Sequence, residues 1–359
     1  MNDDRFHMTD NKGIPKTKTQ CLKIVISGIG TGGHFFPAIV VAQELQKRRL
    51  EVIFLVRKGY FEEEVATRYG LKTVTVKSGA FYGTSVFSKI FSILALIYSV
   101  YQIRAITRNV VGIAFGGFGA LPLVISCMIN RSAFYLFEPN RVPGRATKLC
   151  ASKARRVFLG LGLTSRLKGG SVVTGIPIRS QFKTRLVKSR KKKKRRKKVL
   201  FLGGSQGARK LNKLALGIQK FLPKGYEIII ICGKRDYTWV NSKRNGRTKV
   251  LPFTFSPWNE MRDADVIVSR SGALAGYEIL SSNIPTVFIP FPYAIDDHQY
   301  HNAEYFSLMG NAVVMREENV TEKILVEKII RLISTKKKKS TINLGAEKKI
   351  ADIIFKDNR

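Results

Sequence analysis

The sequence predicts an α/β protein of two similar halves, each a parallel sheet with helices on both faces, which face each other across a cleft. Its length of 359 residues suits two domains of ordinary size. Short apolar segments alternate with helical ones along the chain, as in parallel sheets. A strand, a glycine-rich loop and a helix follow one another twice, from Leu22 and from Lys198. Because ligands of open α/β sheets bind at the carboxyl ends of the strands, we expect one site between the halves.

The first half begins with an apolar strand over 22–27, followed by the glycine loop 28–34 and a helix over 38–46. Helical stretches separate most of the strands expected after it. These strands are 51–56, 73–76, 111–115, 133–137, 156–159 and 171–173.

The segment 86–103 is rich in Phe, Ile, Leu and Tyr, and it could be mistaken for a membrane span. Lys89 interrupts it and Arg104 ends it, so its uninterrupted apolar part is shorter than the roughly 20 residues that cross a bilayer. Two interpretations stay open: a plain core helix, or a helix beside Arg104 and Arg108 that lies partly in a lipid surface.

The second half repeats the pattern with a strand over 198–202, a glycine loop over 203–208 and a helix over 209–221. Further strands are expected at 227–232, 266–269 and 286–290. We therefore divide the chain into a polar tail (1–21), an N-terminal Rossmann-like domain (22–180), a basic linker (181–198) and a C-terminal Rossmann-like domain (199–359). The last helix could pack back on the N-terminal domain.

Composition narrows the function classes. Hydrophobic residues make up 44% of the chain, so disorder is excluded. The net charge of +38 has two open interpretations: compositional drift with a solvated loop at 191–198, or attraction to anionic lipid. Specific nucleic-acid binding is disfavoured, because lysines are spread along the whole length. The four cysteines show no CxxC spacing and are expected to be buried thiols: Cys21, Cys127, Cys150 and Cys232. The polar first 20 residues contain no apolar core of signal-peptide length.

The two glycine loops predict a phosphate-containing ligand. Such a loop lets backbone approach a phosphate, and the N–H groups and dipole of the following helix favour negative charge. Neither loop is a Walker sequence or a full dinucleotide fingerprint, so ATP and NAD chemistry are disfavoured. Ser205 and Gln206 in the second loop could hydrogen-bond a diphosphate without a metal. A sugar nucleotide fits, with no metal and no cofactor.

Each of three further segments contains polar groups that could have either a functional or a purely structural role. Glu278 begins a helix after a strand, where it could bind ribose hydroxyls or simply face the helix dipole. The turn 290–299, followed by Asn302, could hold a sugar or be only a polar loop. His34 closes the first glycine loop and could be a general base or a structural histidine.

These segments together resemble a known family, the MurG-type peptidoglycan N-acetylglucosaminyltransferases, which have the two-Rossmann-domain GT-B fold. The resemblance covers the chain from about Leu22 to its end. The matching segments are GTGGHFFP (30–37), GGF (116–118), EPN (138–140), TGIPIR (174–179), GGSQGARKLN (203–212), RSGALAGYE (270–278) and DHQ (297–299) with NA (302–303).

The resemblance implies which residues hold UDP-N-acetylglucosamine. Ser205 and Gln206 would lie at the diphosphate, Glu278 at the ribose, Gln299 at the sugar and the backbone around Thr254 at the uracil. His34 would be the catalytic base. The remaining donor-site residues implied are Thr31, Gly32, Gly33, Asn140, Arg179, Arg270, Ala273 and Leu274, with both arginines near the diphosphate.

The implied reaction is an inverting transfer of N-acetylglucosamine to the 4-hydroxyl of the muramic sugar of lipid I, which gives lipid II and UDP. The enzyme would work peripherally at the cytoplasmic face of the plasma membrane, on an anionic surface. The alternatives are another GT-B enzyme that uses a UDP-sugar on a different acceptor, and a non-catalytic basic module. Four residues depart from the family pattern: Ile29, Pro139, Ile176 and Tyr277.

Overall fold

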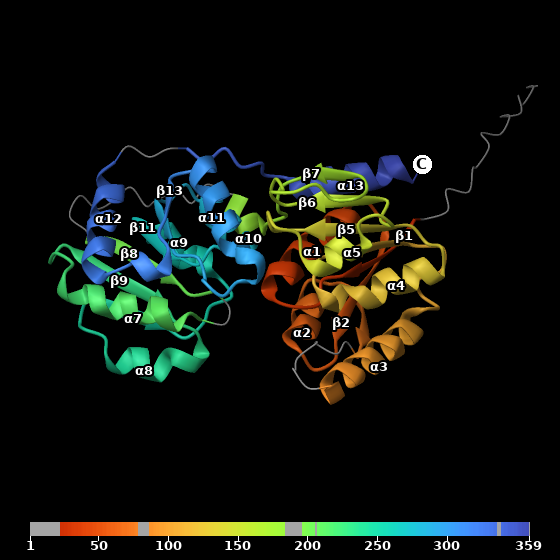
Figure 1. Cartoon of the computed structure of the whole chain (residues 1–359), viewed down its shortest axis with the longest axis horizontal. Helices are drawn as coiled ribbons and strands as arrows, with labels where there is room; N and C mark the ends of the chain where they lie inside the picture. The colour runs from red at the N-terminus through yellow and green to blue at the C-terminus, as the bar shows by residue number, and fades with distance from the viewer. Residues whose placement is uncertain (1–21, 78–85, 184–195, 205–206, 336–338, 359) are drawn as a thin grey trace, which may run out of the picture.

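The computed structural model describes residues 22–77, 86–183, 196–204, 207–335 and 339–358. The chain forms two α/β halves side by side, with the N-terminal half at the right of Figure 1 and the C-terminal half at the left. Cys21, the tail 1–21, part of the basic linker (184–195) and the predicted site residues Ser205 and Gln206 lie outside the described residues.

The N-terminal half alternates strands and helices. Its strands are β1 (Lys23–Ser27), β2 (Glu51–Arg57), β3 (Lys72–Val76), β4 (Val111–Ala114), β5 (Phe134–Glu138), β6 (Arg156–Leu159) and β7 (Ser171–Val173). Its helices are α1 (Gly32–Lys47), α2 (Phe61–Arg68), α3 (Val86–Ile103), η1 (Phe118–Ala120), α4 (Leu121–Ile129), α5 (Arg145–Cys150) and α6 (Ser180–Lys183).

The C-terminal half repeats this alternation. Its strands are β8 (Lys197–Leu202), β9 (Tyr226–Ile231), β10 (Thr248–Leu251), β11 (Val266–Ser269), β12 (Thr286–Phe288) and β13 (Ala312–Val314). Its helices are α7 (Arg209–Gly217), η2 (Ile218–Lys220), η3 (Lys234–Asp236), α8 (Tyr237–Ser242), α9 (Pro257–Asp263), α10 (Ala273–Ser281), η4 (Ile295–Asp297), α11 (His298–Met309), η5 (Glu317–Asn319), α12 (Glu322–Ser334) and α13 (Ala346–Asp357).

Both sheets are parallel and wound in the same way, which confirms the predicted fold class. The strand order is β3-β2-β1-β4-β5-β6-β7 in the first sheet and β10-β9-β8-β11-β12-β13 in the second. In each sheet the first strand lies where the order reverses, beside β4 or β11, and a glycine loop follows that strand. Ligands of such sheets bind at this switch point, so the topology brings both loops to the ligand-binding edge of their sheets.

Two strands of the second sheet, β10 and β13, were not predicted from the sequence. Both are short edge strands, and β13 is only half-buried throughout. The edge strand β7 is as short as β13 and was predicted, so short length alone does not account for the two strands that were missed.

Helix α1 begins at Gly32, six residues before the expected start, with Thr31 in extended conformation at the N-cap. Pro37, which directly precedes the expected start, lies inside α1. The consequence for function is that His34 lies in the first helical turn rather than in a loop.

The last helix, α13, lies on the N-terminal half, next to β6 and β7 in Figure 1. It packs against α1, and its residues Ile350, Ala351 and Ile354 belong to the same buried cluster as Ile24 of β1. Arg48 of α1 forms an ion pair with Asp352 (Nη1–Oδ1 2.6 Å). The end of the chain therefore ties the two halves together on the side away from α3.

Helix α3 has the predicted bounds and is not a plain core helix. Among its described side chains, seven large apolar ones are exposed, here called the α3 patch: Ile90, Phe91, Ile93, Leu94, Ile97, Tyr98 and Tyr101. In Figure 1 the helix lies at the outer, lower edge of the N-terminal half. No helix within the described ranges is long and apolar enough to cross a membrane.

The four departures from the family pattern are accommodated by packing. Ile29 and Ile176 are buried core residues. Pro139 packs against Gly160: a Cβ added at Gly160 would lie 3.0 Å from the Cα of Pro139. The buried Tyr277 donates its hydroxyl to the carbonyl of Asn343 (2.6 Å), so it links α10 to the segment before α13.

Three of the cysteines lie in the described residues, and the prediction of buried thiols is confirmed for these. They are Cys127, Cys150 and Cys232. Burial raises the pKa of the Cys127 thiol to about 12, so this side chain is an unreactive part of the core.

Candidate functional site

A cavity of about 820 Å³ lies between the two halves. Both glycine segments contribute to its walls, as the topology requires. All twelve predicted site residues that are described line it: Thr31, Gly32, Gly33, His34, Asn140, Arg179, Thr254, Arg270, Ala273, Leu274, Glu278 and Gln299. Residues from six separate segments thus converge on one space large enough for a sugar nucleotide.

His34 lies against the backbone of the loop after β4. A Cβ at Gly116 would come within 2.8 Å of the imidazole, and Gly116 has a φ of +59°, so a glycine is needed there. Nδ1 is buried and has no hydrogen-bond partner among the described residues. Nε2 is therefore the nitrogen available to the cavity. Burial lowers the pKa of His34, Glu138 opposes that shift and His298 adds to it. A neutral imidazole, able to accept a proton near pH 7, is the result.

The carboxylate of Glu138 shapes the wall next to His34. It is buried at the end of β5, and its four hydrogen bonds come from neutral donors. Oε1 accepts from the backbone N–H (3.1 Å) and Nδ2 (3.2 Å) of Asn140. Oε2 accepts from the N–H of Gly144 (2.9 Å) and the hydroxyl of Thr147 (2.6 Å). These bonds fix the turn that carries Asn140 into the cavity.

Arg179 and Glu278 form a buried pair on the floor of the cavity. Oε1 of Glu278 accepts from Nε (3.2 Å) and Nη2 (3.0 Å) of Arg179. Burial raises the pKa of Glu278, and the guanidinium opposes this shift. Both hydrogen bonds use Oε1, so Oε2 keeps its acceptor capacity for a ligand such as ribose. The guanidinium is committed to this carboxylate and to the carbonyl of Phe255 (3.1 Å) rather than directed to a free phosphate position.

Thr254 lies between two aromatic residues that also line the cavity. The rings of Phe253 and Phe255 meet edge to face with centroids 4.8 Å apart. The hydroxyl of Thr254 accepts a hydrogen bond from the N–H of Ser256 (3.0 Å), which holds this turn. An apolar wall beside exposed backbone suits a flat heterocycle such as a nucleobase.

Arg270 follows β11, and its guanidinium braces the next loop of the sheet. Nη1 donates to the carbonyls of Ile289 (3.0 Å) and Pro290 (2.9 Å), and Nη2 lies 2.5 Å from Oε2 of Glu317. Like Arg179, this arginine is occupied by protein groups in the structure. Ala273 and Leu274 form the first turn of α10 beside it, where helical N–H groups point toward the cavity edge.

Gln299 lies in the first turn of α11. Its Oε1 accepts from the N–H of Phe291 (3.1 Å), and its own carbonyl accepts from the hydroxyl of Ser271 (2.7 Å). The two residues before α11, Asp296 and Asp297, have φ values of +53° and +48°, which are uncommon outside glycine. The turn from 290 to 299 is thus held by hydrogen bonds from Arg270 and Ser271, which follow β11, and by a bond within the turn itself.

Some cavity residues were not predicted. The charged and aromatic residues among them are three cations near the second glycine loop, four phenylalanines, one acid and one histidine: Arg209, Lys210, Arg235, Phe36, Phe253, Phe255, Phe291, Glu317 and His298. Glu317 follows β13, so the rule that sites gather at carboxyl ends of strands would have indicated it if that strand had been recognised. Within the described ranges no group of three or more His, Cys, Asp or Glu side chains is placed to hold a metal ion.

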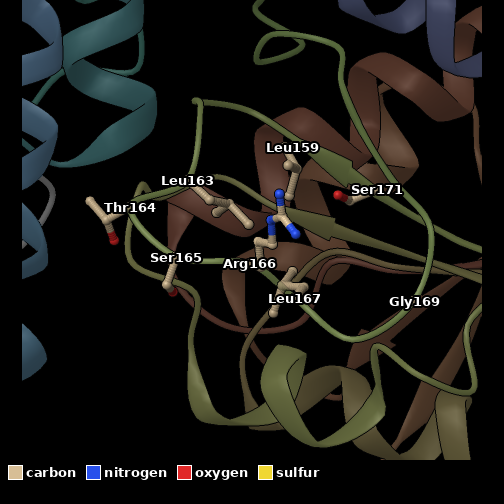
Figure 2. A pocket seen from close by; sticks show the side chains of 8 residues that line it. All are labelled: Leu159, Leu163, Thr164, Ser165, Arg166, Leu167, Gly169 and Ser171. Atoms are coloured by element: carbon tan, nitrogen blue, oxygen red, sulfur yellow. The ribbon is translucent and has the colours of Figure 1, made fainter.

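A second cavity, of about 480 Å³, lies within the N-terminal half, around the loop between β6 and β7. Figure 2 shows the side chain of Arg166 reaching between Leu159, Leu167 and Ser171. This cavity shares no lining residue with the one between the halves and contains no predicted site residue. It does not belong to the candidate site.

Comparisons with known proteins agree with this geometry. The glycosyltransferase family 28 N-terminal domain matches residues 24–159, and the family 28 C-terminal domain matches residues 198–355. Two curated relatives are each named UDP-N-acetylglucosamine–N-acetylmuramyl-(pentapeptide) pyrophosphoryl-undecaprenol N-acetylglucosamine transferase. That of Aquifex aeolicus is 31% identical over 82% of this chain and 87% of its own length. That of Coxiella burnetii (strain RSA 331 / Henzerling II) is 32% identical over 84% and 86%.

A solved structure shows the same architecture. The crystal structure of Acinetobacter baumannii MurG aligns with a TM-score of 0.69 and 22% identity, covering 93% of this chain and 99% of that one. At this identity the likeness concerns the fold, which is that of two facing Rossmann-like domains.

Proposed function

This chain belongs to the MurG family of glycosyltransferases, and from that membership we propose that it transfers N-acetylglucosamine from UDP-N-acetylglucosamine to the 4-hydroxyl of the muramic sugar of undecaprenyl-linked lipid I. The products are lipid II and UDP. In this proposal residues 199–359 hold the donor and residues 22–180 hold the acceptor, with the cavity between them as the reaction site.

The donor assignment is supported by the described residues that line the cavity, and it follows the roles that the family resemblance implies. The turn around Thr254 would take the uracil, Oε2 of Glu278 the ribose, the second glycine loop with Ser205 and Gln206 the diphosphate, and Gln299 the sugar. Thr31, Gly32, Gly33 and Asn140 would close on the sugar from the other half.

Two groups of cavity residues would bear on the diphosphate. The N–H groups of Ala273 and Leu274 face it with the positive end of α10. Since Arg179 and Arg270 are engaged by protein groups, we assign the direct neutralisation of the departing UDP to Arg209, Lys210 and Arg235.

His34 carries the chemical step in this proposal. Nε2 removes the proton of the acceptor hydroxyl as its oxygen forms a bond to the anomeric carbon. The bond from that carbon to the UDP oxygen breaks, and UDP leaves with the electron pair, so the configuration inverts. The observation that supports this role best is the lowered pKa of a cavity-lining imidazole whose other nitrogen is buried.

The α3 patch supports a peripheral position at the cytoplasmic face of the plasma membrane. Its exposed apolar side chains have basic neighbours: Lys77 lies 5.2 Å above the ring of Tyr98, and Arg104, Arg108 and Arg131 are exposed at the end of the helix and beside it. Apolar side chains that enter a lipid surface and cations that meet anionic headgroups act together. This face would bring the cleft to a lipid-anchored acceptor.

Conversion of lipid I to lipid II tests the function. The purified chain is incubated with UDP-N-acetylglucosamine and lipid I in vesicles, and products are identified by mass. We expect lipid II and one UDP per transfer. Transfer only to another lipid or sugar acceptor would favour a different GT-B enzyme, and absence of any UDP-sugar turnover would reject the proposal.

A further inference from the structure

Asn302 of α11 makes three hydrogen bonds that join the two halves. Its Oδ1 accepts from the backbone N–H of Arg141 (3.0 Å) in the N-terminal half. Its Nδ2 donates to Oδ1 of Asn140 (3.0 Å) in the same half and to the carbonyl of Ser271 (3.2 Å) in the C-terminal half. The side chain has no exposed surface. It therefore has no room for a ligand, although the sequence had suggested that it could hold a sugar.

The bonds of Asn302 reach both walls of the cavity. On one side, Asn140 is held between Asn302 at Oδ1 and the carboxylate of Glu138 at Nδ2 (3.2 Å). On the other side, the residue whose carbonyl it binds, Ser271, donates its hydroxyl to the carbonyl of Gln299 (2.7 Å). One buried amide thus fixes Asn140 relative to the turn that carries Gln299.

The other polar contacts between these two segments are exposed or indirect. Lys148 and Asp296 form an ion pair at 3.5 Å with both side chains about half exposed (47% and 50%). The guanidinium of Arg141 lies 5.9 Å from the ring centroid of Tyr305. Exposed pairs contribute little, whereas a buried amide that loses its partners leaves unsatisfied polar groups. The buried polar link between these two segments therefore runs through Asn302.

We propose that Asn302 is a positioning residue that couples the two halves of the site, setting the distance between Asn140 in the N-terminal half and the turn of the C-terminal half that carries Gln299. It touches no substrate and acts through Asn140 and Ser271. The kinetic test of this positioning role rests on the proposed function, whereas the test of the distance between the halves does not.

The kinetic test uses Asn302→Asp. This variant keeps an acceptor for the N–H of Arg141 and puts a carboxylate oxygen against two acceptors, Oδ1 of Asn140 and the carbonyl of Ser271. We expect kcat to fall about 10- to 100-fold, since small misplacements of reacting groups have effects of this size. The Kd for UDP should change less than about threefold, because the proposed contacts to the nucleotide lie within the C-terminal half.

Lys148→Met is the matched control, since it removes an exposed contact from the same interface. We expect wild-type kinetics from it. A kcat within about twofold of wild type for Asn302→Asp would overturn the proposal. An equal loss of UDP affinity and kcat would also overturn it, because that pattern indicates a general structural defect.

A double-mutant cycle tests whether Asn302 acts through Asn140. If the two act as a unit, Asn140→Ala combined with Asn302→Asp should have about the same kcat as the more impaired single variant. Additive losses would overturn the proposed path. Asn140→Ala alone also removes the hydrogen bond between Asn140 and Asn302, and it leaves the buried Asn302 unchanged. It therefore replaces Asn302→Asp in these tests if that variant folds poorly.

The structural test needs no substrate. Spin labels at Lys153→Cys and Lys213→Cys, in a chain with Cys21→Ser, report the distance between the halves by pulsed electron resonance. We expect a broader distance distribution for Asn302→Asp and for Asn140→Ala, but not for Lys148→Met. Unchanged distributions in both would overturn the proposal. A broadened distribution in a chain that makes no lipid II would instead retain the coupling and reject the proposed function.

Discussion

The guanidinium of Arg179 and the carboxylate of Glu278 form a buried ion pair (Nη2–Oε1 3.0 Å) enclosed by aromatic rings from both halves. The Arg179 guanidinium carbon lies 4.4 Å from the ring centroid of Phe36 in α1, 5.1 Å from that of Phe182 in α6 and 5.0 Å from that of Trp258 in α9. The pair thus lies where the first half, the linker and the second half meet. Each charge depends on the other, since both side chains are less than a tenth exposed.

Replacement of Arg179 by Met should destabilise the chain by about 3–5 kcal/mol, because it leaves the buried carboxylate of Glu278 without its partner. Urea unfolding followed by fluorescence measures the loss. The double variant with Glu278→Met should recover much of it, because no buried charge remains. If Arg179→Met alone unfolds at the wild-type urea concentration, the pair has no structural role.

The rate of transfer should fall at acid pH through the protonation of His34. Its pKa lies below the ordinary value of 6.5 because burial disfavours the imidazolium. Only the neutral form accepts a proton, so kcat/KM should be level above pH 6.5 and decrease as pH falls below it. The pH profile of lipid II formation checks this, and an inflection above pH 6.5 would contradict the assignment.

His34→Gln should lower kcat by about 10²- to 10⁴-fold and remove that inflection, since no general base remains. The Kd for UDP, measured by calorimetry, should stay within about twofold of wild type. Wild-type turnover in this variant would exclude His34 from the base role.

Arg270→Met should raise the KM for UDP-N-acetylglucosamine about tenfold. The guanidinium holds the carbonyls of Ile289 and Pro290, and the loss of hydrogen bonds from a charged group costs about 1.5–3 kcal/mol. The Kd for UDP alone should change much less, because the braced turn faces the sugar. Loss of UDP affinity in proportion would show that Arg270 acts at the diphosphate instead.

Glu317→Gln is a milder change to the ion pair that Arg270→Met removes. It removes the charge opposite Arg270 but keeps a polar group of the same size. A smaller increase in the same KM is expected, and the two effects should not add, because both act on one pair.

Phe91→Ser with Tyr101→Ser should weaken binding to anionic vesicles by at least about tenfold. These side chains are 73% and 76% exposed in the α3 patch, and burying one such side chain in an apolar phase contributes about 1.5–3 kcal/mol. Vesicle sedimentation measures the binding. Phe221→Ser, which removes an exposed ring from the C-terminal half, is the matched control. Equal effects from both changes would refute a specific lipid-facing role for α3.

The sequence predicted the fold class because both sheets follow one strong local rule. Buried parallel strands such as β1 read as continuous apolar runs, with Ile24, Val25 and Ile26 fully buried. The glycine loops follow from close backbone approach, which only glycine permits. No glycine loop follows either of the edge strands β10 and β13, and both were missed.

The family resemblance of the sequence also indicated twelve described residues that line the cavity, in agreement with the rule that the carboxyl ends of parallel strands meet at one edge of each sheet. The tertiary structure decided what those residues are bonded to. Arg179, Arg270 and Asn302 all seemed available to a ligand, yet each is held by groups far away in the chain: Glu278, Ile289 with Pro290, and Asn140. A motif records which side chains a site contains, whereas hydrogen-bond partners depend on tertiary packing. For Arg270 that packing lies within the second half, and for Arg179 and Asn302 it joins the two halves.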